Sequence, residues 1–164
     1  MRILFINPFG IGDVLFTTPA IRAIKEAYPQ SFVGYWCNIR VAPLLVSNPR
    51  INRIFALSRG DIKKLYKESF LKGLAGSFKL LSALKKERFD ICLDFSLDHR
   101  YGLAAKIVGI KRRIGFNYKQ RGRFSFIYYP LTKQSRRLRE GFSLSIASPK
   151  KQSQQTLIFL TASL

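Results

Sequence analysis

Short apolar runs alternate with amphipathic stretches along most of the chain. Apolar or alternating runs predict five strands, at residues 2–7, 31–37, 51–57, 89–96 and 112–116. Apolar residues at helical spacing predict helices between them, at residues 19–28, 39–47, 70–86 and 100–109. Strands and helices that alternate through short connections are typical of a parallel sheet with helices on both faces. The pattern therefore predicts an α/β fold with a Rossmann-like parallel sheet.

Two of these elements show which side chains share a face. Alternate residues of the predicted strand at 89–96 point to opposite sides, and one side carries Phe89, Ile91, Leu93 and Phe95. The longest predicted helix, at 70–86, gathers five apolar residues on one face: Leu71, Leu74, Phe78, Leu81 and Leu84. Lysines in its last turn have the sign that favours a helix C-terminus, so we expect the helix to end near residue 86.

A glycine-rich turn, Asn-Pro-Phe-Gly-Ile-Gly-Asp at residues 7–13, follows the first predicted strand. Gly10 and Gly12 fit the first two glycines of a dinucleotide-binding fingerprint, but Leu15 stands where the third glycine is required. No Gly-Lys-Ser/Thr follows, so the turn is not a P-loop either. Asp13 puts a carboxylate where a phosphate would lie, and like charges repel. We therefore expect no phosphate group on this turn.

Asp13 is the first candidate for chemistry. The positive end of a helix stabilises a carboxylate, and the carboxyl edge of a parallel sheet is where ligands bind. An ionised, positioned carboxylate there can accept the proton of a sugar hydroxyl as that hydroxyl attacks. The alternative is that Asp13 only caps the following helix, which is a common use of aspartate.

Thr17 and Thr18, which precede Pro19, allow two interpretations of where this helix begins. In one, Thr18 is the N-cap and Pro19 occupies the first helical position. In the other, the helix begins at Asp13 and Pro19 kinks it. Either way, both threonine hydroxyls lie within about two turns of Asp13, where they could contact a ligand or act as caps.

Polar residues also gather at the carboxyl end of the fourth predicted strand. Asp94, Ser96, Asp98, His99 and Arg100 could line an acceptor pocket at the same edge as Asp13. Arg100 could pair with a carboxylate or phosphate through its forked guanidinium. Two alternatives stay open: Asp94 is buried and held by backbone N–H groups, and His99 is an exposed loop residue.

The charge of the chain requires an anionic partner. Its 164 residues carry 29 Lys and Arg against 9 Asp and Glu, a net charge of +20. From His99 to Arg139 there are twelve Lys or Arg and no acid, and aromatic residues such as Tyr118 and Phe124 are interleaved with Lys111, Arg112, Arg113, Lys119, Arg121 and Arg123. The aromatic rings of such a surface could stack on the bases of a nucleic acid while its cations bind the phosphates, or the surface could dock on an anionic membrane.

Cysteine, histidine and hydropathy exclude several classes of protein. Cys37 and Cys92 fall in apolar runs, which predicts buried thiols rather than a disulfide scaffold. One histidine excludes a multi-histidine metal site. The chain has no apolar run of about 18 residues and no secretory signal at its start. These features predict a cytoplasmic protein with reduced thiols.

Three segments resemble a known family in order and content. Residues 10–29, GIGDVLFTTPAIRAIKEAYP, resemble the opening of the glycosyltransferase family 9 heptosyltransferases, and so do residues 89–96 (FDICLDFS) and 111–119 (KRRIGFNYK). The similarity extends over residues 1 to about 131. It implies a two-domain GT-B glycosyltransferase whose N-terminal Rossmann-like domain binds the acceptor.

The resemblance also implies a reaction and a site. An acceptor hydroxyl attacks the anomeric carbon of a nucleotide sugar, ADP-heptose, which binds the second domain, and no metal or other cofactor takes part. Asp13 falls on the general base of the family, and the substrate-binding candidates near it are Gly10, Gly12, Thr17, Thr18, Ser96 and Arg100. The implied acceptor is the lipid-linked, phosphorylated inner core of lipopolysaccharide. The enzyme would work peripherally on the inner face of the inner membrane.

The chain departs from the family after residue 133. Residues 1–133 are the predicted acceptor domain, whereas residues 134–164 are rich in Ser and Gln and end in an apolar stub. We interpret this tail as truncated or out-of-frame sequence; the alternative is a flexible tail with a docked terminal strand. With no donor domain in view, we expect residues 1–164 to be inactive alone. The rival function is a basic Rossmann-like nucleic-acid-binding domain, and a third possibility is a non-functional fragment that folds.

Overall fold

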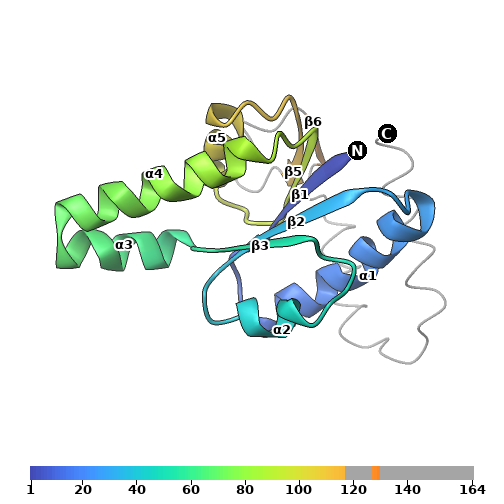
Figure 1. Cartoon of the computed structure of the whole chain (residues 1–164), viewed down its shortest axis with the longest axis horizontal. Coiled ribbons are helices and arrows are strands. Elements are labelled where there is room, and N and C mark those ends of the chain that lie inside the picture. The colour runs from blue at the N-terminus through green and yellow to red at the C-terminus, as the bar shows by residue number, and fades with distance from the viewer. Residues whose placement is uncertain (117–126, 130–164) are drawn as a thin grey trace.

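A six-stranded parallel sheet forms the centre of the protein (Figure 1), seen in a computed structural model that describes residues 1–116 and 127–129. The strands are β1 (Arg2–Ile6), β2 (Phe32–Cys37), β3 (Arg53–Ala56), β4 (Ile91–Asp94), β5 (Arg112–Phe116) and β6 (Ile127–Tyr129). Their order in the sheet is β3-β2-β1-β4-β5-β6, and every neighbouring pair is parallel. The five predicted strands are confirmed. The short β6 was not predicted, because three residues are too few to show a pattern.

Five helices connect the strands in the described part of the chain. They are α1 (Ile11–Ala27), α2 (Ala42–Val46), α3 (Arg59–Glu68), α4 (Phe70–Lys86) and α5 (His99–Ile107). The predicted helix at 19–28 was too short, because α1 begins at Ile11, already within the glycine-rich segment at 7–13. Helix α3 was missed because it is mostly polar. Its capping box gives the signal that could have found it: Ser58 and Asp61 each accept a backbone N–H of the other.

Pro19 lies inside α1, and neighbouring threonines compensate for it. Proline has no N–H, so the carbonyl of Leu15 loses its usual helical donor. The hydroxyl of Thr18 donates to that carbonyl at 2.8 Å instead. The helix therefore continues through Pro19, and the interpretation with Thr18 as N-cap is wrong.

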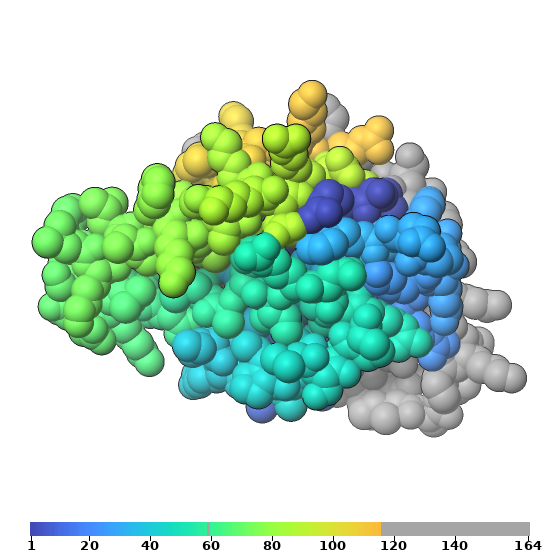
Figure 2. Space-filling model, viewed as in Figure 1, coloured from blue at the N-terminus to red at the C-terminus, as the bar shows by residue number. Residues whose placement is uncertain are grey.

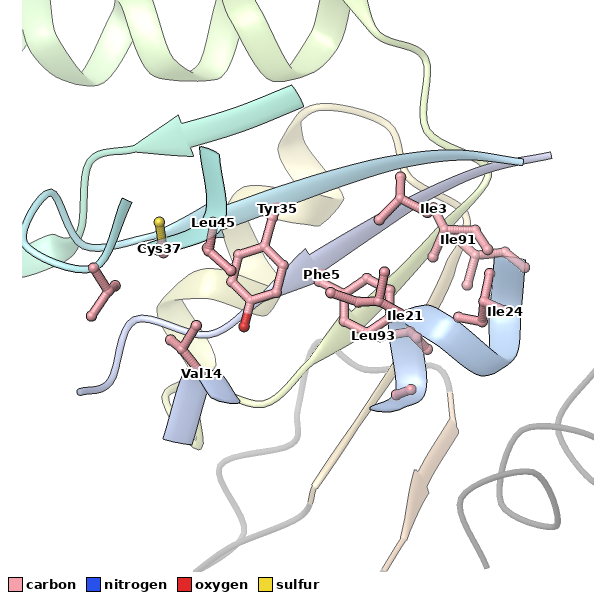
Figure 3. Packing of buried hydrophobic residues seen from close by; sticks show 13 residues of the cluster. Ile3, Phe5, Val14, Ile21, Ile24, Tyr35, Cys37, Leu45, Ile91 and Leu93 are labelled. Carbon is pink, nitrogen blue, oxygen red and sulfur yellow. The ribbon is translucent and has the colours of Figure 1, made fainter. Parts of the chain in front are cut away.

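Two hydrophobic clusters cover the two faces of the sheet. Alternate residues of β1 point to opposite sides: Phe5 packs with α1 and α2, whereas Leu4 packs with α4 and α5. Figure 3 shows the first cluster, where Ile21 and Ile24 of α1 lie against the sheet. Helices thus cover both faces, and the predicted α/β fold class is confirmed.

Both cysteines lie in these clusters. Burial raises the pKa of the Cys37 thiol to about 12 and raises the pKa of Cys92 well above its usual value, since an apolar environment disfavours a thiolate. The thiolate is the reactive form, so both residues should be inert in the native protein. We expect dithionitrobenzoate to label neither thiol until denaturant unfolds the chain. Rapid labelling of native protein would contradict this packing.

The apolar face of α4 is divided between core and solvent. Leu80 and Leu84 are buried against the sheet, but Leu71, Leu74 and Phe78 are exposed. The amphipathic pattern was therefore correct, but only the second half of the helix has a sheet to pack on. The reason is length: 17 helical residues span about 25 Å, whereas a strand of four residues spans about 13 Å.

Two further expectations concern a membrane span and the end of the chain. Over the described residues, no helix is both long and apolar enough to cross a bilayer. The predicted tail at 134–164 and most of the aromatic positions in the basic stretch lie outside the described residues, so those expectations stay predictions.

Candidate functional site

A cleft of about 630 Å³ lies at the carboxyl edge of the sheet. Strand β1 is flanked by β2 on one side and β4 on the other, so the strand order reverses there. Ligands of open α/β sheets bind at this reversal point, outside the carboxyl ends of the strands. The cleft is lined from the loops after β1, β2 and β4 and from the start of α3, including Pro8, Phe9, Asn38, Arg40, Asp61, Lys64, Ser96, Asp98 and Tyr101.

Two buried asparagines fix the loops of this edge. Asn7 ends the first strand; its side-chain amide donates to the Asp13 carbonyl at 2.9 Å, and its oxygen accepts the Phe9 N–H at 3.2 Å. Asn38 follows β2 and donates to the carbonyls of Pro8 and Phe9. Neither asparagine was predicted as a site residue, although Asn7 is the last residue of the first predicted strand and Asn38 directly follows the second. Together they hold the glycine-rich turn in one position.

Asp13 lies in the first turn of α1, at the same edge as the cleft. Its side chain is exposed, and no hydrogen bond reaches its carboxylate from the described residues. The N-cap position belongs to Gly10, which supplies no side-chain cap. The alternative that Asp13 only caps the helix is therefore not supported. Asp13 is not among the residues that line the described cleft, so the carboxylate stands beside it and open to solvent.

Gly10 and Gly12 surround Asp13 with free space. A Cβ atom at either position would meet nothing within 4 Å, so internal packing does not require a glycine at either residue. Both take part in a helix N-terminus whose amide groups no side chain caps. The predicted role of these glycines, close approach of a ligand to the backbone, stays a prediction that this open space permits.

The two threonine hydroxyls are already engaged. Thr17 is buried; its hydroxyl donates to the Val14 carbonyl and lies 2.5 Å from the Tyr35 hydroxyl. Thr18 donates to Leu15, as described above. Burial raises the pKa of Tyr35 to about 12, and the hydrogen bond between Tyr35 and Thr17 opposes that rise. In this structure both threonines have structural roles, and ligand contact would require their hydroxyls to change partners.

The turn after β4 brings only part of the predicted cluster into the cleft. Ser96 and Asp98 line it, and the Ser96 hydroxyl donates to the Asp98 carbonyl at 3.2 Å. Leu97 between them has φ 55°, a left-handed conformation that turns the chain back on itself. Arg100 is exposed, lies in the first turn of α5, and does not line the described cleft. His99 is exposed as well, with its Nδ1 3.5 Å from Asp98 Oδ1.

Asp94 is buried at the end of β4, which agrees with the alternative that backbone N–H groups hold a buried Asp94. Its carboxylate accepts the Ser96 N–H at 2.8 Å. Burial raises the pKa of Asp94 to about 6, while the hydrogen bonds from Ser96 oppose that rise. Asp94 therefore supports the turn that shapes the cleft and carries a charge that changes near neutral pH.

Asp61 and Asp98 line the cleft together with two cations, Arg40 and Lys64. Both cations are exposed, and neither forms an ion pair with any residue in the described ranges. Asp61, by contrast, is occupied by the capping box of α3. Neither cation was predicted from the sequence: Arg40 follows shortly after the second strand, which is a usable signal, but only the fold brings Lys64 to the same cleft. The pair can bind a phosphate or carboxylate group.

Known proteins are similar to this chain over part of their length. No model of a protein family matches the chain. A lipopolysaccharide heptosyltransferase 3 of Escherichia coli is 24% identical over 110 residues, which cover 67% of this chain and 31% of that protein. Its counterpart in Escherichia coli strain K12 is 22% identical over 113 residues, which cover 68% of this chain and 31% of that protein. The chain thus spans about a third of the length of these relatives.

Solved structures resemble the chain over more of its length. Escherichia coli heptosyltransferase WaaC with ADP-2-deoxy-2-fluoro heptose has a TM-score of 0.70 at 19% identity, covering 92% of this chain and 50% of that one. Escherichia coli ADP-heptose lps heptosyltransferase II has a TM-score of 0.64 at 22% identity, and the match covers 82% of this chain and 36% of that one. The fold is therefore that of the Rossmann-like half of a GT-B glycosyltransferase. The sequence and structure comparisons together confirm the resemblance to the heptosyltransferases of glycosyltransferase family 9.

Proposed function

We propose that this chain is the acceptor-binding half of an inverting glycosyltransferase of lipopolysaccharide synthesis. It would present an inner-core acceptor to a nucleotide-activated heptose. The observation that carries the proposal is the exposed Asp13 carboxylate, held by a fixed turn at the same sheet edge as a cleft that Arg40 and Lys64 line. The similarity to heptosyltransferases supports this reading of the site.

Asp13 would act as the general base. An acceptor hydroxyl attacks the anomeric carbon of the donor, a new C–O bond forms, and the bond to the diphosphate oxygen breaks. The Asp13 carboxylate takes the hydroxyl proton in the same step. Asn7 serves this chemistry by fixing the Asp13 backbone, so that the carboxylate is positioned before the substrates arrive.

Arg40 and Lys64 would recognise the acceptor. The inner core of lipopolysaccharide carries phosphate and sugar-acid groups, which can pair with these two cations because neither forms an ion pair with a described residue. The cleft is also large enough for a sugar ring, since ligand pockets usually span about 300–1,000 Å³. Ser96 and Asp98 would supply hydroxyl and carbonyl partners for sugar hydroxyls on the opposite wall.

In this proposal the sugar donor does not bind the cleft that holds the acceptor. A nucleotide sugar, with ADP-heptose as the expected one, would bind a second domain that faces Asp13, so residues 1–164 alone should not bind it tightly. The reaction uses no metal ion in this scheme. The acceptor is anchored in lipid, so the protein would work as a peripheral protein at the inner face of the inner membrane.

Calorimetry can separate these roles. We expect the chain to bind a phosphorylated inner-core oligosaccharide and not ADP-heptose. Replacing both cleft cations, Arg40→Gln with Lys64→Gln, should weaken oligosaccharide binding by about tenfold or more, because charged hydrogen bonds are lost. Arg22→Gln, on the exposed side of α1 away from the cleft, is the matched control and should bind as the parent does.

Two outcomes would contradict the proposal. Micromolar binding of ADP-heptose by residues 1–164 would overturn the acceptor-domain assignment. Tight, steeply salt-dependent binding to random duplex DNA, with no binding to the oligosaccharide, would favour the rival of a basic nucleic-acid-binding domain.

A further inference from the structure

Helix α3 and the first half of α4 form an arm that stands out from the domain. We call residues 59–79 the arm; Figure 1 shows its two helices side by side, extending beyond the sheet to the left. Figure 2 shows the same segment protruding from the body. Since α3 begins where Ser58 and Asp61 line the cleft, the arm projects from the carboxyl edge of the sheet.

The arm carries an apolar stripe that the domain does not cover. The stripe consists of Phe70, Leu71, Leu74 and Phe78, which are 68%, 73%, 51% and 73% exposed. At about 100° per residue these four positions share one side of α4. Single exposed apolar residues are ordinary, but four large ones gathered on one helix face mark an interaction surface.

Helix α3 leaves most of the stripe uncovered, because it packs on another side of α4 and reaches only Phe70, whose ring centroid lies 5.8 Å from that of Tyr66. Gly73 and Gly76 face α3: a Cβ on Gly73 would lie 2.3 Å from the Tyr66 ring, and one on Gly76 would lie 2.7 Å from Leu65. The two helices therefore pack as closely as glycine allows. Further along, Leu80 and Leu84 anchor α4 to the sheet. These contacts hold the arm so that the stripe faces outward.

Lysines surround the stripe. Residues 59–86 contain eight Lys or Arg against Asp61 and Glu68, and Asp61 is engaged in the capping box. Lys72 and Lys79 follow one edge of the stripe along α4, and Lys63 and Lys67 lie on α3. All four are exposed, and Lys72 pairs with Glu68 at 3.3 Å. A large apolar face bordered by lysines is the arrangement of helices that lie in the interface of anionic membranes.

We propose that the arm docks this protein on an anionic lipid bilayer, with the stripe inserted at the level of the headgroups. Charge complementarity selects this occupant: a second copy of the chain, which carries +20, would bring like charges together around the stripe. Docking through the arm would also set the cleft at the membrane surface. The inference adds a membrane site to the proposed function and assigns it to the arm rather than to the basic stretch at 99–139.

Vesicle co-sedimentation tests the arm directly. Vesicles of equal parts phosphatidylglycerol and phosphatidylethanolamine contain neither acceptor nor donor, so binding is read independently of the proposed transferase function. We expect Leu71→Ser with Phe78→Ser to weaken binding by about thirtyfold or more, since two inserted side chains are lost. Lys63→Gln with Lys67→Gln should weaken it about twentyfold and reduce its salt dependence.

Two matched controls locate the effect. Val46→Ser with Ile107→Ser removes apolar residues that are 72% and 61% exposed outside the arm, and should leave binding unchanged. Lys111→Gln with Arg112→Gln removes exposed charges of the basic stretch and should reduce binding less than the arm lysines do. If this last pair abolished binding while the stripe variant bound normally, the basic stretch would be the docking surface and the proposal would be wrong.

A second measurement does not depend on removing the stripe. The chain has one tryptophan, Trp36, which is buried, so Phe78→Trp adds an exposed reporter. We expect vesicles to shift its emission to the blue and brominated lipids to quench it. An unchanged spectrum would overturn the proposal. The proposal would also be wrong if the stripe variant lost self-association and still bound vesicles. A loss of stability in that variant would overturn it as well, because it would show that this chain itself covers the stripe.

Discussion

Asp13→Asn is expected to lower kcat by about two to four orders of magnitude in a form of this protein that carries a donor-binding domain. Asparagine keeps the size and polarity of the side chain but cannot take the proton of the attacking hydroxyl. The turn that holds residue 13 depends on its backbone carbonyl, which Asn7 binds at 2.9 Å, so the substitution should not disturb the fold. Steady-state kinetics with ADP-heptose and an inner-core acceptor measure the effect.

Measuring kcat and substrate affinity separately shows whether Asp13 acts in the chemical step or in binding. If Asp13 acts only in the chemical step, KM for both substrates and calorimetric donor affinity should change little. Glu26→Gln, at the other end of the same helix and exposed, is the matched control and should keep full turnover. Normal turnover by the Asp13→Asn variant would reduce Asp13 to a structural residue of α1.

The central strands could be predicted from the sequence because each is buried on both faces. A run such as Ile3 to Ile6 is apolar throughout, so its pattern does not depend on which neighbour covers it. The same holds for Ile91 to Leu93. Helix α3 escaped prediction for the opposite reason: few of its side chains are buried, and it packs on α4 rather than on the sheet.

The stripe on α4 shows where a correct pattern still misleads. Leu71 and Leu84 lie on one predicted face, and periodicity treats them alike. Only the relative lengths of helix and sheet decide that Leu84 is buried and Leu71 is exposed. That comparison needs the strand bounds, which a sequence gives poorly.

The candidate site was predicted unevenly for a related reason. Asp13 and Ser96 each follow a strand closely, so a parallel sheet places both at the carboxyl edge without further information. Arg40 comes from the loop after β2 and Lys64 from α3, and only the tertiary fold brings both to the lining of one cleft. Arg100 was predicted there from its charge and its place after the fourth strand, and the structure leaves it outside the lining of the described cleft.

Asp94→Asn should change how stability depends on pH. The folded-state pKa of Asp94 is raised to about 6, above the value of about 3.9 for an exposed aspartate, because burial disfavours the charge. The folded state therefore holds this proton more tightly than the unfolded state, and stability falls as pH rises from about 4 to above 6. A difference of about two pKa units corresponds to about 3 kcal/mol of lost stability above that range.

Urea unfolding at about pH 5 and about pH 8 measures the slope, because roughly half of that loss falls between the two values. We expect the parent to lose about 1–2 kcal/mol more than the Asp94→Asn variant over this interval. The asparagine oxygen can still accept the Ser96 N–H, so the turn at the cleft should persist. Any fixed cost of burying its amide is the same at both pH values and cancels. Glu26→Gln reports what losing one exposed negative charge does to so basic a chain. Equal slopes for parent and variant would mean that water reaches Asp94, and that the turn beneath the cleft is more open than its buried carboxylate indicates.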